Sequence, residues 1–189
     1  SNVEFVIVDG TLEISKRTVT LTSADDEKVY DGTALTNDEV TVGGDGFATG
    51  EGATYDVTGT RTEKGSSANA FTYTLNEGTK ADNYTITKTE GTLTVTELTD
   101  KVTVTITEHS GSYKYDGGEK SVTGYDVTSI SNSLYTEADF TFSGNDSVSG
   151  TDAGSYDMKL SADDFTNTSS NFSNVEFVIV DGTLEISKR

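Results

Sequence analysis

The chain has 189 residues, with 32 Asp or Glu against 13 Lys or Arg, so its formal net charge is -19 at pH 7. This acidity argues against partners that require a basic surface, namely nucleic acids and anionic membranes. The chain contains no Cys and a single His, which argues against disulfides, thiol chemistry and His-based catalysis. We therefore expect no enzyme activity, no catalytic residues, no metal site and no cofactor, and no direct membrane binding.

Apolar residues alternate with Thr in several short segments along the chain. The segments 18–22, 71–75 and 102–107 each place apolar side chains on one face and Thr on the other. A period of two is typical of half-buried strands, and β-branched Thr suits the solvated face. Asp-Gly pairs, the strongest short hairpin signal, lie between such segments. The sequence therefore predicts an all-β fold, β-sandwich-like or β-grasp-like.

One repeat in the chain is literal. Residues 1–17 and residues 173–189 both read SNVEFVIVDGTLEISKR, at an offset of 173 − 1 = 172 residues. Chance does not produce a 17-residue identity. We therefore expect a tandem array with a period of 172 residues, in which residues 1–17 are the tail of the preceding repeat.

A second, weaker repeat divides this period. At an offset of 85, KVYDG at 28–32 falls on YKYDG at 113–117, and Phe71 falls on Tyr156. Beyond residue 75 the offset becomes 91, and the difference, 91 − 85, predicts a six-residue insertion near 163–170. We expect two homologous β-domains in tandem, a shorter one at 18–97 and a longer one at 101–189. Because no Gly or Pro separates residues 12–17 from the strand at 18–22, we expect a strand-linked, elongated rod.

Three motifs in order carry a family resemblance: Tyr30-Asp31-Gly32, then NYTIT at 83–87, then GTLTVT at 91–96. Their order and duplication make the chain resemble the YDG/MBG-type tandem β repeats of bacterial cell-surface adhesins. The longer domain departs from the pattern, since Val175 stands in place of the Tyr of NYTIT. The resemblance implies an extracellular repeat on a bacterial surface, acting as stalk or spacer and in host-surface attachment. Its implied partners are neighbouring repeats of the same chain, with binding of host glycan or mucin as the alternative.

The candidate site residues are aromatic and acidic. We interpret two equivalent motifs as structural turns, with the Gly at positive φ, rather than as cation-binding carboxylates: Tyr30, Asp31 and Gly32, and Tyr115, Asp116 and Gly117. Three tyrosines in loop-rich parts of the longer domain are the candidate glycan contacts: Tyr113, Tyr125 and Tyr135. No Lys aligns between the two domains, so we expect no Lys–Asn isopeptide bond.

The duplicated segment contains apolar side chains on both faces of a predicted strand, Val3–Val8. Its twin at 175–180 should complete the core of the longer domain, buried on both faces. The copy at the start of the chain has no such domain of its own. We expect Val3–Val8 to hang out as an arm or to pair with another molecule's edge, and residues 12–17 to extend as strand into the first domain.

Overall fold

The computed structural model describes residues 2–189, which divide into two compact units. The first unit comprises residues up to Glu27 together with Ala34–Arg61 and Ser66–Thr94; the second comprises Lys28–Thr33, Thr62–Gly65 and Val95–Arg189. Regular structure in the described residues consists of strands and three single-turn 3-10 helices, so the all-β prediction is confirmed. Among these residues no helix has the length and apolar character needed to cross a membrane.

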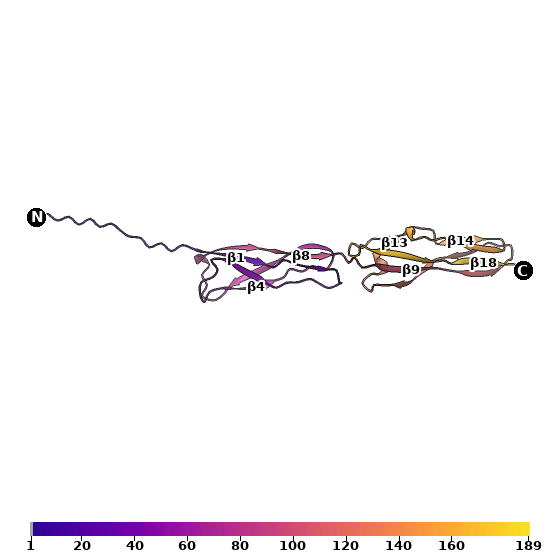
Figure 1. Cartoon of the computed structure of the whole chain (residues 1–189), viewed down its shortest axis with the longest axis horizontal. Helices are drawn as coiled ribbons and strands as arrows, with labels where there is room; N and C mark the ends of the chain where they lie inside the picture. Colours follow the sequence, from indigo (N-terminus) through magenta and orange to yellow (C-terminus); the bar gives the residue numbers. More distant parts are fainter. Residues whose placement is uncertain (1) are drawn as a thin grey trace. The chain divides into compact units, whose positions relative to one another are not determined.

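Strands β1 to β8 form three sheets (Figure 1). The sheet β3-β1-β7 consists of Val40–Gly44, Arg17–Ser23 and Tyr84–Thr89. The sheet β2-β8-β5 consists of Asp26–Val29, Gly91–Thr96 and Gly65–Asn69. The pair β4-β6 consists of Ala53–Val57 and Phe71–Leu75, and the helix η1 is Ala81–Asn83.

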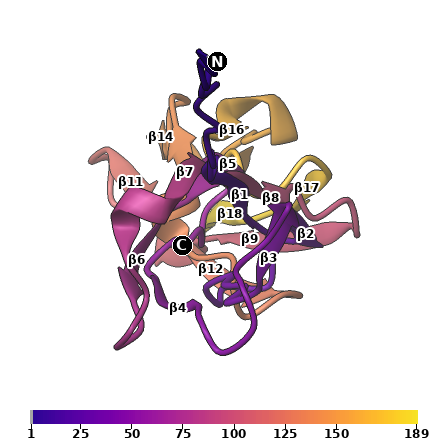
Figure 2. The same ribbon diagram turned by 90° about the vertical axis from the view of Figure 1, so that its left-hand side faces the viewer.

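Strands β9 to β18 form four sheets, and Figure 2 views the strands from another side. The sheet β12-β9-β17 consists of Tyr125–Ile130, Val102–Glu108 and Val175–Val180. The sheet β10-β18-β15 consists of Gly111–Lys114, Thr183–Ser187 and Gly154–Asp157. The pairs β13-β16 and β11-β14 consist of Phe140–Phe142 with Phe165–Asn167, and Lys120–Thr123 with Ser147–Gly150. The helices η2 and η3 are Glu137–Asp139 and Ala162–Asp164.

The internal repeat is visible in the strand pairing. Strand β1 pairs antiparallel with β3 and parallel with β7, and β9 pairs antiparallel with β12 and parallel with β17. In the described residues no two consecutive strands pair with each other. The Asp-Gly pairs at 31–32, 45–46, 116–117 and 181–182 do separate strands, but the chain crosses to another sheet there instead of forming a hairpin, as between β17 and β18.

The strand register places the six-residue insertion of the longer repeat at a different position from the one that the sequence offset predicts. Val57 of β4 pairs with Phe71 of β6, and the equivalent Phe142 of β13 pairs with Phe165 of β16. The residue of the longer repeat that is equivalent to Phe71 is thus Phe165, not Tyr156 as the sequence offset predicts. The extra residues of the longer repeat lie at 158–164, between β15 and β16, rather than near 163–170.

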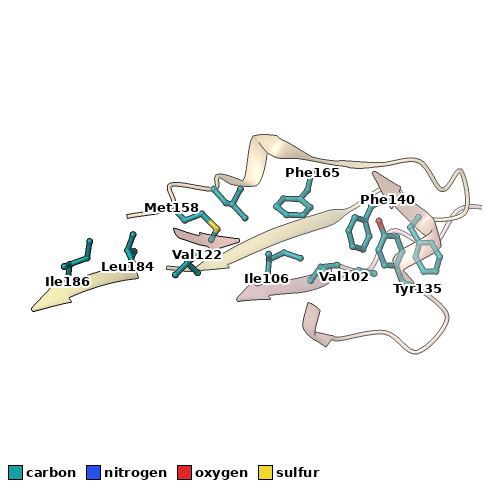
Figure 3. Packing of buried hydrophobic residues seen from close by; sticks show 12 residues of the cluster. Val102, Ile106, Val122, Tyr135, Phe140, Met158, Phe165, Leu184 and Ile186 are labelled. Carbon is teal, nitrogen blue, oxygen red and sulfur yellow. The ribbon is translucent and has the colours of Figure 1, made fainter. Parts of the chain in front are cut away.

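The core of the second unit lies between two sheets, as in a β-sandwich. Val102, Val104 and Ile106 of β9 are fully buried and join one apolar cluster with Leu184 and Ile186 of β18. Figure 3 shows Leu184 and Ile186 at one end of this cluster and the rings of Tyr135 and Phe140 at the other. A separate cluster in the first unit is formed by Val19, Leu21, Phe71 and Tyr84.

The start of the chain forms an exposed arm in the single chain. Residues 2–16 have no regular structure and are solvent-exposed, including Phe5 and Ile7. Strand β1 begins only at Arg17, where its pairing with Tyr84 of β7 begins, so the expected strand over residues 12–16 is not formed.

The twin of the arm, β17, is buried on one face only. Val175, Phe177 and Ile179 pack against the core of the second unit, whereas Val178 and Val180 are exposed. The expectation of burial on both faces is therefore wrong. The reason is that β17 turns one face toward the core, and its other face is exposed to solvent.

Candidate functional site

The first Tyr-Asp-Gly loop is closed by its carboxylate. Oδ1 of Asp31 accepts hydrogen bonds from the Thr33 N–H at 2.9 Å and from the Thr33 hydroxyl at 2.7 Å. It also accepts one from Lys28 Nζ at 2.7 Å, and Gly32 has φ +77°. The Lys28 hydrogen bond, followed by those from Thr33, lowers the pKa of Asp31 to about 2. The carboxylate therefore holds its own loop, in an Asx-type turn.

The second loop reaches the same arrangement with a different lysine. Oδ1 of Asp116 accepts a hydrogen bond from the Gly118 N–H at 2.9 Å, and Oδ2 accepts one from Lys120 Nζ at 2.7 Å. Gly117 has φ +83°, and the Lys120 hydrogen bond is the main reason that the pKa of Asp116 is lowered. The lysine precedes the Asp in the first loop and follows it in the second, so the turn recurs although no Lys aligns.

The two loops differ in what covers them. Within the second unit, the half-buried Tyr30 ring meets the Phe172 ring edge to face, with centroids 5.5 Å apart. A Cβ built on Gly32 would lie 2.8 Å from Leu134 Cδ2, whereas one built on Gly117 would meet nothing within 4 Å. Tyr115 is 39% exposed. The second loop thus presents a partly exposed aromatic side chain.

The structure separates the three candidate glycan contacts. Tyr113, on β10, is 40% exposed and lies two residues from Tyr115. Tyr125 is half-buried and packs edge to face on Phe142 and Phe165, at 5.0 and 5.2 Å between ring centroids. This packing leaves Tyr125 in the aromatic core rather than on a binding surface.

Tyr135 must be removed from the glycan contacts, because it is 2% exposed. Its hydroxyl donates to the Asp139 carbonyl at 3.1 Å and lies 3.0 Å from Asn167 Oδ1. Burial raises the pKa of Tyr135 to about 12. A ring that fills the core offers no face to a sugar, and only the Tyr113 and Tyr115 rings remain as an accessible aromatic pair among the sequence-predicted site residues.

A buried carboxylate that sequence reasoning missed lies at the end of β9. Glu108 is 3% exposed and accepts two backbone hydrogen bonds, from the Leu160 N–H and the Gly182 N–H, both at 2.6 Å. At the equivalent end of β1, Ser23 Oγ accepts from the Gly91 N–H at 2.9 Å. The signal was present in the sequence, because Glu108 continues the buried phase of Val102, Val104 and Ile106.

A hollow of about 460 Å³ lies at the start of β1 in the first unit. Its lining consists of Ile14, Ser15, Lys16, Arg17, Ala48, Glu51, Asp82, Asn83 and Tyr84. The Tyr84 hydroxyl donates to Glu51 and accepts from the Ala48 N–H at 3.0 Å. Arg17 Nε donates to the Gly46 carbonyl at 3.0 Å. The floor of the hollow is therefore held by hydrogen bonds within the first unit.

The single His is engaged in local contacts. His109 Nδ1 lies 2.9 Å from the Thr123 carbonyl and Nε2 lies 3.3 Å from Asp126 Oδ1. The Thr123 hydrogen bond, and then that to Asp126, raises the pKa of His109. Within residues 2–189, no three His, Asp or Glu side chains are grouped so that they could hold a metal ion.

Comparison with known proteins gives one match. Residues 101–188 match the family model described as MBG domain. No curated protein and no solved structure matches the chain. The resemblance to YDG/MBG-type repeats is therefore confirmed by this match, and an MBG domain fits a repeat unit of a surface protein.

Proposed function

Because residues 101–188 form a domain of the MBG family, we propose that the chain is a repeat unit of a bacterial surface adhesin and acts there as an extracellular stalk or spacer. The observation that carries this proposal is the duplication of one strand topology, β3-β1-β7 in one repeat and β12-β9-β17 in the other. A spacer is built by repeating a unit, and the 17-residue identity between 1–17 and 173–189 extends the repetition beyond this pair.

The surface chemistry supports a spacer more than a catalyst. The net charge of -19 keeps an edge-rich β protein from associating with itself. The chain has no Cys, and its single His is bonded to Thr123 and Asp126, so the residues give no support to a thiol-based or His-based catalytic centre. The proposed role needs no catalysis and no cofactor, and its partners are neighbouring repeats.

Surface location is tested by labelling intact cells of the source bacterium with antibodies raised against the purified chain. We expect labelling without permeabilisation, and loss of the label after protease treatment of intact cells. Labelling that requires permeabilisation would contradict an extracellular role. A strain that lacks the gene is the control for antibody specificity.

Attachment to host glycan or mucin is the second candidate, and the exposed pair Tyr113 and Tyr115 favours it, because sugar rings stack on accessible aromatic faces. The test is binding of the chain to immobilised mucin and to a glycan array. A binding module would bind and would lose binding in Tyr113→Ala. A spacer binds neither surface, and Thr74→Ala, at an exposed position of β6, is the matched control.

A further inference from the structure

The second Tyr-Asp-Gly loop is attached to the duplicated segment by backbone hydrogen bonds. The Tyr115 N–H donates to the Ser187 carbonyl at 2.9 Å, and the Ser187 hydroxyl donates to the Tyr113 carbonyl at 3.2 Å. Strand β10 pairs in parallel with β18, with Tyr113 opposite Ile186. The exposed Tyr115 ring is thus carried beside residues 186–189.

The identical copy of these four residues lines the hollow of the first unit. Residues 14–17 and 186–189 both read ISKR, and Ile14 to Arg17 form one wall of that hollow. In an array with the 172-residue period, one such segment does both: Ser187 bonds the Tyr115 loop of one repeat, and Lys188 and Arg189, the equivalents of Lys16 and Arg17, line the hollow of the next, while Ile186 stays in the core of the first. The Tyr115 loop of one repeat and the hollow of the next are then both in contact with this segment.

We propose that the hollow at Arg17 and Tyr84 is the seat for the Tyr115 loop of the preceding copy of this unit. This inference rests on the proposed function, because it requires consecutive copies, and it adds the residues that join them. The partner is a second copy of this chain, identified by the identity of residues 14–17 with 186–189.

The first Tyr-Asp-Gly loop is an example of such a loop with its tyrosine ring packed against another residue of the protein. The Tyr30 N–H donates to the Thr96 carbonyl at 2.9 Å, and Thr96 corresponds to Ser187 at the offset of 91. Within the second unit the Tyr30 ring packs on Phe172, and burial is the main reason that its pKa is raised. Tyr115 has the same backbone anchor, but its side chain is 39% exposed and no ring among the described residues packs on it.

The hollow matches a tyrosine side chain in size and chemistry. A volume of about 460 Å³ admits a ring, and Ala48 together with the Tyr84 ring gives an apolar surface. Glu51 and Arg17 supply an acceptor and a donor near a tyrosine hydroxyl. Arg17 and Tyr84 are held by Gly46 and Ala48, so this side of the seat is ordered before the loop arrives.

The test uses the full chain continued from Arg189 into a second copy of residues 18–189. Because the chain has no Cys, two introduced cysteines report on one contact. Gly118→Cys in the first copy keeps the N–H that closes the loop, and Ala48→Cys in the second copy keeps the N–H that bonds Tyr84. The control pairs Gly118→Cys with Thr74→Cys, at an exposed position of β6 outside the hollow.

The measurement is the rate of disulfide formation under mild oxidation, followed by mass spectrometry. We expect the Ala48 pair to close about tenfold faster than the Thr74 pair, because docking raises its effective concentration. Adding Tyr115→Ala should remove this advantage. Equal rates in the two pairs would overturn the proposed seat.

A second measurement uses the same tandem without introduced cysteines, so that no substitution affects the result. Hydrogen exchange of the peptide around Tyr115 should show two equal populations, one like the single chain and one slower. A single population that exchanges like the single chain would also overturn the seat. Either negative result leaves the surface location and spacer role standing, since those are tested by cell labelling.

Discussion

Replacing Glu108 by Gln should destabilise the second unit with almost no change in side-chain shape. Its carboxylate accepts the Leu160 and Gly182 N–H groups, both at 2.6 Å, from a residue that is 3% exposed. Glu108→Gln retains one acceptor oxygen and turns an NH₂ group toward the other N–H. One buried N–H then lacks a partner, which costs about 1–3 kcal/mol.

The site cannot relax easily to recover this bond. A Cβ built on Gly182 would lie 2.8 Å from Glu108 Cβ and 2.3 Å from the His109 carbonyl oxygen, so the two segments already touch. We therefore expect Glu108→Gln to lower the free energy of unfolding of the second unit by about 1–3 kcal/mol. Urea denaturation followed by circular dichroism measures this change.

Glu185→Gln is the matched control, because it makes the same substitution at an exposed position of β18. It should change the free energy of unfolding by no more than about 0.5 kcal/mol. If Glu108→Gln matched this control, the two hydrogen bonds would not stabilise the unit, and our account of how the end of β9 is joined to the start of β18 would be refuted.

Four further changes and one mass measurement have expected outcomes. Gly117→Val should lower the free energy of unfolding by about 1–2 kcal/mol in urea denaturation because Gly117 has a positive φ, and Gly32→Val should lower it more because Leu134 also obstructs the side chain. Wild-type midpoints in both variants would show that the positive φ does not restrict these positions to Gly. Because the pKa of His109 is raised in the folded state, its protonation stabilises the protein below pH 6.5, and this contribution is lost as the pH rises through the folded-state pKa. His109→Ala should therefore make the free energy of unfolding less dependent on pH above 6.5. An unchanged pH profile would contradict this role of His109. Deleting residues 1–9 should leave both units folded, as judged by their urea transitions, because residues 2–9 are exposed; unfolding of the first unit would move the predicted boundary at 18. The intact mass should equal the sequence mass, and a loss of ammonia or water would reveal a covalent cross-link.

The strands themselves could be predicted from the sequence, but not their partners. Val102, Val104 and Ile106 alternate with Thr, and β9 indeed buries the first set and leaves the second half-exposed. Pairing depends on segments far apart in the chain, such as the parallel match of Val102 with Val175. An Asp-Gly pair reports only a local bend, so the sequence does not distinguish a hairpin from a crossing between sheets.

Some features of the candidate site could likewise be predicted from the local sequence, and others could not. The positive φ of Gly32 and Gly117 is a local property, and residue type predicts it. Whether a tyrosine is exposed depends on what packs over it: Tyr135 is covered by the core, while Tyr113 is not. The sequence places both in loop-rich regions and offers no local signal that separates them.

The spacer role is tested most directly by changing the number of 172-residue periods in the surface protein and measuring how far a terminal tag lies from the cell. Immunogold electron microscopy of intact cells gives this distance, and mucin binding is measured on the same strains. We predict that the tag moves outward by an equal increment for each added period while mucin binding stays the same. A tag distance that does not change, or mucin binding that rises with each added period, would contradict a spacer.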